Sequence, residues 1–85
     1  MTLILYYFNT CPYCIRVLNT IKHLNLSEEI ELRNIHEKDA YLAERIAFNL
    51  NGKQVPCLLI DGEPMVESAD IIDFLEKNQE KIIKS

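Results

Sequence analysis

The sequence lacks the features that are typical of nucleic-acid-binding, membrane-spanning and secreted proteins. It has no cluster of Lys and Arg, and its formal net charge of −4 makes nucleic acid an unfavourable partner. No apolar stretch approaches the roughly 20 residues needed to span a bilayer, so we expect no membrane association. The first residues also lack the basic region, short apolar region and small-residue cleavage site of a secretion signal. A cytoplasmic location is therefore expected.

Linkers, repeats and low-complexity segments are missing as well, so residues 1–85 are predicted to form a single domain. A chain of this length buries roughly 60 to 65% of its unfolded surface, which suffices for one core without disulfides. The chain has three cysteines, an odd number. Cys11 and Cys14 are too close in sequence for a bond between them to restrain the unfolded chain much, so we interpret them as a redox pair.

Hydrophobic periodicity predicts an α/β fold. The continuous apolar run of residues 3–8 indicates a buried strand, and a helix follows in which Val17, Leu18, Ile21 and Leu24 share one face. Ile30 and Leu32 mark the core side of a second strand, which a right-handed crossover places parallel to the first. A second helix is predicted to be capped by Asp39 and to end at Asn51-Gly52. Its buried stripe would comprise Leu42, Ala43, Ile46, Ala47 and Leu50.

The rest of the chain predicts a hairpin and a last helix. Residues 58–60 form the third strand, and Asp61-Gly62 suits a tight turn into the fourth strand at residues 65–66. Pro64 cannot donate to a ladder, so this strand is expected at the sheet edge. Ser68 is predicted to cap a helix over residues 69–81. The expected product is a four-stranded mixed sheet with three flanking helices.

The segment Cys11-Pro12-Tyr13-Cys14 falls where the first strand ends and the first helix begins. Unpaired N–H groups and the positive end of the helix dipole favour negative charge there, which predicts a reactive thiolate. Pro12 suits the first turn because its missing N–H removes only an unpaired donor. Cys11 precedes the helix and is expected to expose its sulfur, whereas Cys14 should be more enclosed. Cys11 is therefore predicted to be the nucleophile and Cys14 the resolving thiol.

Cys11-Pro12-Tyr13-Cys14, followed later by Val55-Pro56 and by a hairpin that leads to a capped helix, resembles a dithiol glutaredoxin of the thioredoxin fold. The resemblance covers nearly the whole chain. It implies a glutathione-dependent thiol–disulfide oxidoreductase that reduces glutathione–protein mixed disulfides and protein disulfides. It also implies that Pro56 is cis and faces the cysteine pair, and that the backbone of Val55 pairs with bound glutathione. Tyr13 is expected either to shield the disulfide and touch the partner or only to fill space.

Two segments, Gln54-Val55-Pro56 and Glu67-Ser68, resemble instead the N-terminal domains of glutathione transferases. This resemblance implies that Ser68 offers its hydroxyl and backbone N–H to the γ-glutamyl carboxylate of glutathione, while Glu67 meets the amine. A helix N-terminus suits a carboxylate because free N–H groups and the dipole both face it. A full transferase also has a helical second domain, which these 85 residues do not include.

The chain departs from the glutaredoxin pattern at Phe8, where many members have a Lys that contacts glutathione. The glycyl carboxylate of glutathione would then need another cation, and Lys53 and Arg16 are the nearest candidates in sequence. Glutathione is expected as a co-substrate, with no tightly bound cofactor. The expected protein partners are glutathionylated or disulfide-containing proteins, and the chain is expected to be a monomer.

Alternative roles for the cysteines stay open. Zinc needs four ligands, and Cys57 with His23 or His36 offers no second closely spaced pair, so no metal site is predicted. Cys57 lies in an apolar run and is interpreted as a core residue, with a third redox thiol as the alternative. A thioredoxin-like reductant that does not use glutathione, and a module that shares an iron–sulfur cluster between two chains, are the remaining alternatives.

Overall fold

The computed structural model describes residues 1–35, 42–47 and 55–84. In chain order the elements are β1 (Leu3–Tyr7), α1 (Pro12–His23), β2 (Glu31–Asn34), α2 (Leu42–Ala47), β3 (Cys57–Ile60), β4 (Glu63–Met65) and α3 (Ser68–Lys84). The four strands form one mixed sheet in which β1 is parallel to β2, as predicted. The structure adds the strand order, β2-β1-β3-β4, and the antiparallel pairing of β1 with β3. None of the helices in these residues is both long and apolar enough to cross a membrane.

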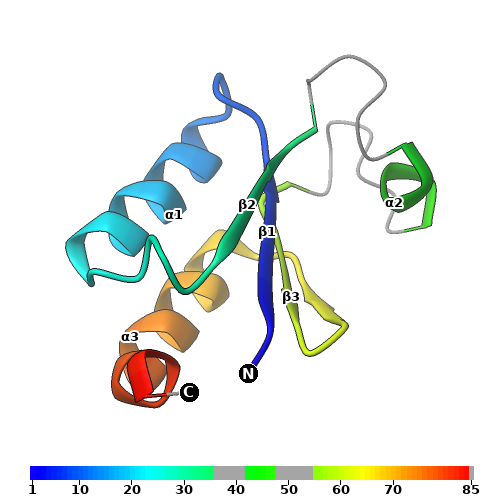
Figure 1. The fold of residues 1–85 in the computed structure, drawn as a ribbon. Coiled ribbons are helices and arrows are strands. Elements are labelled where there is room, and N and C mark those ends of the chain that lie inside the picture. Colours follow the sequence, from blue (N-terminus) through cyan, green and yellow to red (C-terminus); the bar gives the residue numbers. More distant parts are fainter. Residues whose placement is uncertain (36–41, 48–54, 85) are drawn as a thin grey trace.

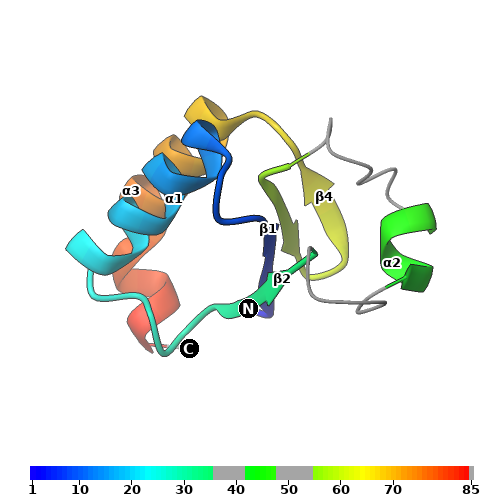
Figure 2. The same ribbon diagram turned by 90° about the horizontal axis from the view of Figure 1, so that it is seen from above.

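Helices α1 and α3 lie side by side on one face of the sheet, and α2 lies on the other side (Figure 1, Figure 2). Of the three predicted helices, α1 and α3 form this packed layer, whereas α2 has only six residues. Its predicted buried stripe is wrong at Ala43, Ile46 and Ala47, which are exposed, Ile46 to 70%. Six residues make fewer than two helical turns, and helical spacing does not specify what covers a face. Nothing is described of residues 39, 50, 51 and 52, or of the Leu42 side chain.

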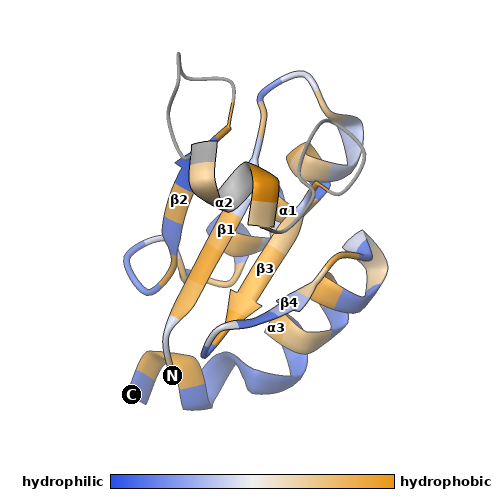
Figure 3. Ribbon diagram, turned by 90° about the vertical axis from the view of Figure 1, so that its right-hand side faces the viewer, coloured by the Kyte–Doolittle hydropathy of each residue, from blue (hydrophilic) through white to orange (hydrophobic). Residues whose placement is uncertain are grey.

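The sheet separates two apolar clusters because alternate side chains of β1 point to opposite faces. Tyr6 lies on the α2 side with Ile35, Cys57 and Leu59. Hydrophobic residues dominate the two central strands, β1 and β3 (Figure 3). On the other face the core between the sheet and the helices comprises Leu3, Leu5, Val17, Ile21, Leu26, Ile30, Leu58, Ile71, Leu75 and Ile82.

Strand β2 is an edge strand, and this changes the predicted burial of its side chains. Leu32 was expected to face the core but is 40% exposed, because no further strand or helix of the described chain lies beyond it. Arg33 lies on the opposite face, where its Nη1 donates to the Tyr6 hydroxyl at 2.9 Å and its guanidinium carbon lies 5.7 Å from the centre of the Tyr6 ring. Its Nε also pairs with Glu31.

The predicted hairpin between β3 and β4 is confirmed, but β4 comprises Glu63–Met65, whereas the sequence predicted its strand at residues 65–66. Asp61 and Gly62 have φ values of 50° and 90°, the positive values that a type I′ turn requires at both central positions. Pro64 lies in the edge strand β4, opposite Leu59, as predicted. The turn is also joined to the start of the chain. The Thr2 N–H donates to Asp61 Oδ1 at 2.7 Å, and the Asp61 N–H donates to the Thr2 carbonyl at 2.9 Å.

Cys57 is fully buried, as predicted for a core residue, and its environment predicts a loss of stability at alkaline pH. Burial raises the pKa of its thiol from 9.0 to about 11. The neutral thiol therefore contributes stability fully below pH 9.0, and this contribution, at most about 3 kcal/mol, is lost as the pH rises to about 11.

Urea unfolding of the wild type and of Cys57→Ala at pH 7.5 and pH 10.5 tests this expectation. The wild type should lose more stability between the two pH values than the variant does. Cys14 is present in both proteins, so its own titration cancels in the comparison. An equal loss in the two proteins would contradict a neutral buried thiol at position 57.

Candidate functional site

The N-terminus of α1 is built around Cys11, which occupies the N-cap position. Its backbone is extended, with φ −84° and ψ 116°, and its carbonyl accepts the first helical bond from the Ile15 N–H at 3.0 Å. The Cys14 N–H donates to Cys11 Sγ at 3.4 Å. The sulfur thus occupies the place that a Ser or Asp oxygen has at other helix starts. None of the residues in the first turn of α1 is acidic, so no carboxylate of this turn opposes negative charge on the sulfur.

The two thiols differ in exposure less than the sequence analysis expected. Cys14 is fully buried, and Cys11 retains only 7% of its surface, so the prediction of an exposed Cys11 sulfur is wrong. The reason is the capping interaction, which turns the Cys11 side chain back over the first helical turn toward the Cys14 N–H. Both thiols are free, as is Cys57, so the structure represents the dithiol form.

The environment of Cys14 keeps its thiol protonated. Burial raises the pKa of Cys14 to about 12, and the hydrogen bond and the charge of Cys11 act in the same direction, while a backbone hydrogen bond of Phe8 acts against them. The Phe8 carbonyl also accepts the Cys11 N–H at 3.4 Å. The backbone of Phe8 is therefore part of the thiol environment. Sequence reasoning missed this role because any residue type supplies the same backbone groups.

Strand pairing brings four further predicted site residues to the end of the sheet where Cys11 lies. Tyr6 of β1 is opposite Cys57 at the start of β3, and Leu58 is opposite Met65 at the end of β4. The end of β1, the start of β3 and the end of β4 therefore meet at one end of the sheet. These strand ends adjoin the residues predicted to form the site, which are Cys11, Val55, Pro56, Glu67 and Ser68. The Val55–Pro56 peptide bond is cis, as the resemblance implied.

The start of α3 differs by one residue from the prediction. The Ile71 N–H donates to the Glu67 carbonyl at 2.9 Å, so Glu67 occupies the N-cap position and Ser68 is the first residue of the helix. The N–H of Ser68 is still one of the first-turn donors that lack a partner within the helix. Asp70 lies in the same turn, where its negative charge competes with that of a bound carboxylate.

The remaining predicted residues differ in exposure, and some of them lie outside the described part of the chain. Tyr13 is 58% exposed, so it does not fill space in the core. Val55 is half-buried and Pro56 is buried. Arg16 is exposed on α1, whereas Lys53, Gln54 and His36 lie outside the described residues.

Cys57 belongs to the cluster on the α2 side of the sheet. In the described part of the chain, no group of three or more His, Cys, Asp or Glu residues is placed to hold a metal ion.

Comparisons with known proteins relate this geometry to a family. Residues 5–81 match the family described as glutathione S-transferase, N-terminal domain. A search of curated proteins gave no match. The crystal structure of a mutant of a thioredoxin-like protein is 26% identical to this chain, with a TM-score of 0.63 over 89% of this chain and 96% of its own. The fold is therefore thioredoxin-like, and the chain belongs to the glutathione S-transferase N-terminal domain family.

Proposed function

We propose that the chain is a glutathione-dependent thiol–disulfide oxidoreductase with the activity of a dithiol glutaredoxin. The observation that carries the proposal is the Cys11 sulfur at the N-cap of α1, which receives the Cys14 N–H while a second, buried thiol stands in the same turn. A transferase-type N-terminal domain supports a role with glutathione. The thioredoxin-like fold is compatible with disulfide chemistry.

In the proposed first step, the Cys11 thiolate attacks the glutathione sulfur of a glutathione–protein mixed disulfide. The substrate protein's thiolate leaves and takes up a proton, and Cys11 now forms a mixed disulfide with glutathione. A second glutathione thiolate attacks the glutathione sulfur of this disulfide, so that the Cys11 thiolate leaves and glutathione disulfide is released. Two glutathione molecules have then supplied the two electrons. A leaving thiolate at a helix N-terminus is stabilised by the same N–H groups that favour it at rest.

Cys14 resolves the other class of substrate. When Cys11 is joined to a protein through a mixed disulfide, the Cys14 sulfur loses its proton and attacks Cys11 Sγ, and the bond between Cys11 and the protein breaks. The protein's thiolate leaves and takes up the proton. Two glutathione molecules then reduce the Cys11–Cys14 disulfide and become glutathione disulfide. The hydrogen bond and charge of Cys11 that raise the Cys14 pKa disappear once Cys11 is covalently bound, but burial, the largest cause, remains. Cys14 therefore has to lose its proton as it attacks Cys11 Sγ.

Glutathione would lie at the end of the sheet where the strand ends converge. The half-buried Val55 is proposed to pair its backbone with the peptide, next to the buried Pro56. At the start of α3 the hydroxyl and N–H of Ser68 would bind the γ-glutamyl carboxylate, and Glu67 would meet the amine. Tyr13, exposed beside the thiols, would contact the partner. A coupled assay of the reduction of a glutathione mixed disulfide tests the proposed activity directly.

A second candidate is a thioredoxin-like reductant that receives electrons from another protein. It is favoured by the solved structure of a thioredoxin-like protein that the chain resembles. For this function glutathione would be irrelevant. The two functions can be separated by measuring the reduction of a protein disulfide with glutathione and with an equal concentration of a different reductant. Turnover that requires glutathione supports the first function, and turnover that does not require it supports the second.

Substitutions of the two thiols should have different effects. Cys11→Ser should abolish all activity, because no other sulfur occupies the N-cap of α1. Cys14→Ser should keep the reduction of glutathione mixed disulfides and lose the reduction of protein disulfides. Cys57→Ala is the matched control and should leave both turnover rates nearly intact, since Cys57 lies in the cluster on the α2 side of the sheet. Loss of both activities in Cys14→Ser would overturn the route assigned to Cys11 alone.

The glutathione site can be tested at Ser68. A hydrogen bond to a charged group contributes about 1.5 to 3 kcal/mol, and the backbone N–H and the dipole remain after the hydroxyl is removed. Ser68→Ala should therefore raise the KM for glutathione by about tenfold, or about 1.4 kcal/mol. Ser27→Ala, at an exposed serine between α1 and β2, is the control and should leave the KM unchanged. An unchanged KM in Ser68→Ala would mean that the γ-glutamyl end is bound elsewhere.

A further inference from the structure

The outer edge of β2 presents backbone groups to the outside of the sheet. β2 is the terminal strand of the order β2-β1-β3-β4. The Ile35 N–H donates to the Tyr7 carbonyl at 2.8 Å, so Ile35 faces β1. Because successive residues of a strand alternate in direction, Glu31 and Arg33 also direct their backbone groups to β1, and Leu32 directs its N–H and carbonyl outward. An edge of this kind can pair with another strand.

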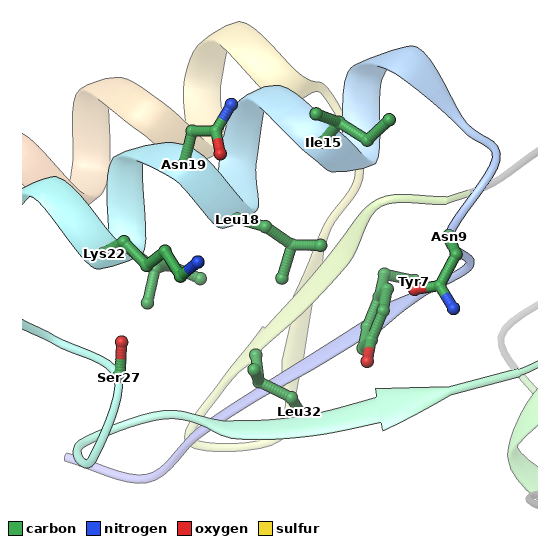
Figure 4. Close-up of a pocket in the computed structure, with 9 residues that line it drawn as sticks. Tyr7, Asn9, Ile15, Leu18, Asn19, Lys22, Ser27 and Leu32 are labelled. Atoms are coloured by element: carbon green, nitrogen blue, oxygen red, sulfur yellow. The ribbon is translucent and has the colours of Figure 1, made fainter.

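On the α1 side of the sheet, this edge carries exposed apolar surface. Leu32 is 40% exposed, and it adjoins a groove of about 320 Å³ between α1 and β2. Leu18 of α1 and Leu32 point toward one another across this groove, and Ile15 lies further along the helix (Figure 4). The groove has a mixed lining, in which Asn19 and Lys22 accompany the apolar side chains. Covering the exposed apolar surface of Leu32 with a second surface would remove it from water, which is favourable.

On the opposite face of the sheet, the same edge carries two opposite charges in a fixed arrangement. Glu31 and Arg33 are two residues apart on β2, so their side chains share that face, and they form an ion pair. Arg33 is also held by the Tyr6 hydroxyl at 2.9 Å and by the Tyr6 ring.

We propose that β2 pairs antiparallel with β2 of a second copy of this chain, with Leu32 opposite the partner's Leu32. The two Leu32 residues would exchange two backbone hydrogen bonds, because their N–H and carbonyl groups point outward. On one face each Leu32 side chain would cover the other beside the two grooves. On the other face Glu31 would lie opposite the partner's Arg33, and Arg33 opposite the partner's Glu31, which gives a row of alternating charges.

The charge pattern selects this register over its neighbours. A two-fold pairing centred on Glu31 would place two glutamates directly opposite each other, and one centred on Arg33 would place two arginines opposite each other. Like charges in directly opposed positions destabilise a strand pair, whereas opposite charges stabilise it. Only the register centred on Leu32 pairs each charge with its opposite. A dimer of this kind replaces the monomer that the sequence analysis expected, and it does not depend on the chemistry of the thiols.

Sedimentation velocity of the protein in excess reductant, over a range of concentrations, tests the proposal. The weight-average mass of the wild type should rise from that of one chain toward that of two. Glu31→Arg and Arg33→Glu each place like charges opposite each other twice in the dimer, so each should weaken self-association by about tenfold or more. Glu80→Arg, an equal charge change on an exposed residue of α3, is the control and should associate like the wild type.

The decisive sample is an equimolar mixture of Glu31→Arg and Arg33→Glu. One chain then has two arginines at the edge and the other two glutamates, so the heterodimer regains both opposite-charge pairs. Its association should return to the wild-type level. A wild type that stays monomeric at all concentrations, single variants that associate like the wild type, or a mixture of folded variants that does not recover would each overturn the proposal.

Amide hydrogen exchange of the wild type provides a measurement that needs no substitution. The Arg33 N–H faces β1 in either state, so its protection should not depend on concentration. The Leu32 N–H faces outward and should be protected only in the dimer, so its exchange rate should fall by the same factor as the fraction of monomer. Exchange of Leu32 that stays fast at concentrations where the mass is that of a dimer would show that another surface mediates the association.

Discussion

The pairing of β1 with its two neighbours is the constraint on which the rest of the structure depends. Leu5 and Tyr6 are consecutive residues, both are buried, and they belong to clusters on opposite faces of the sheet. A slip of one residue would exchange the two faces and place the tyrosine against α1 and α3. The register also fixes where β1 ends, and therefore where the chain turns into Cys11 and the first turn of α1.

Features set by local chemistry could be predicted from the sequence. Asp61 and Gly62 adopt the positive φ values that a tight hairpin needs, and Pro64 lies in an edge strand, where its missing N–H leaves no ladder position unpaired. The exposure of Leu32 and Ile46 could not be predicted in this way. Whether an apolar side chain is buried depends on which element lies above it, and the spacing of residues along one strand or helix contains no such information.

The candidate site also combines features that the sequence predicts with features that depend on three-dimensional contacts. The junction of a strand and a helix located Cys11, and the spacing to Cys14 placed the second thiol one turn further along α1. The near-complete burial of Cys11 follows from a three-dimensional contact, the turn of its sulfur toward the Cys14 N–H. The helix start at Ser68 was misassigned by one residue because both Glu67 and Ser68 precede an apolar stripe. Only the carbonyl that accepts the first helical bond distinguishes the two positions.

The two hydrogen bonds between Thr2 and Asp61 have a practical consequence for the orientation of the molecule. They use the backbone N–H and carbonyl of Thr2, so they do not require a free amino group on Met1, which is exposed. Residues joined in front of Met1 would leave both bonds intact. This attachment point lies at the start of β1, at the opposite end of the sheet from Cys11. A tag, fluorophore or solid support attached there would lie at the opposite end of the sheet from the start of α1 and would leave that end open to the solution.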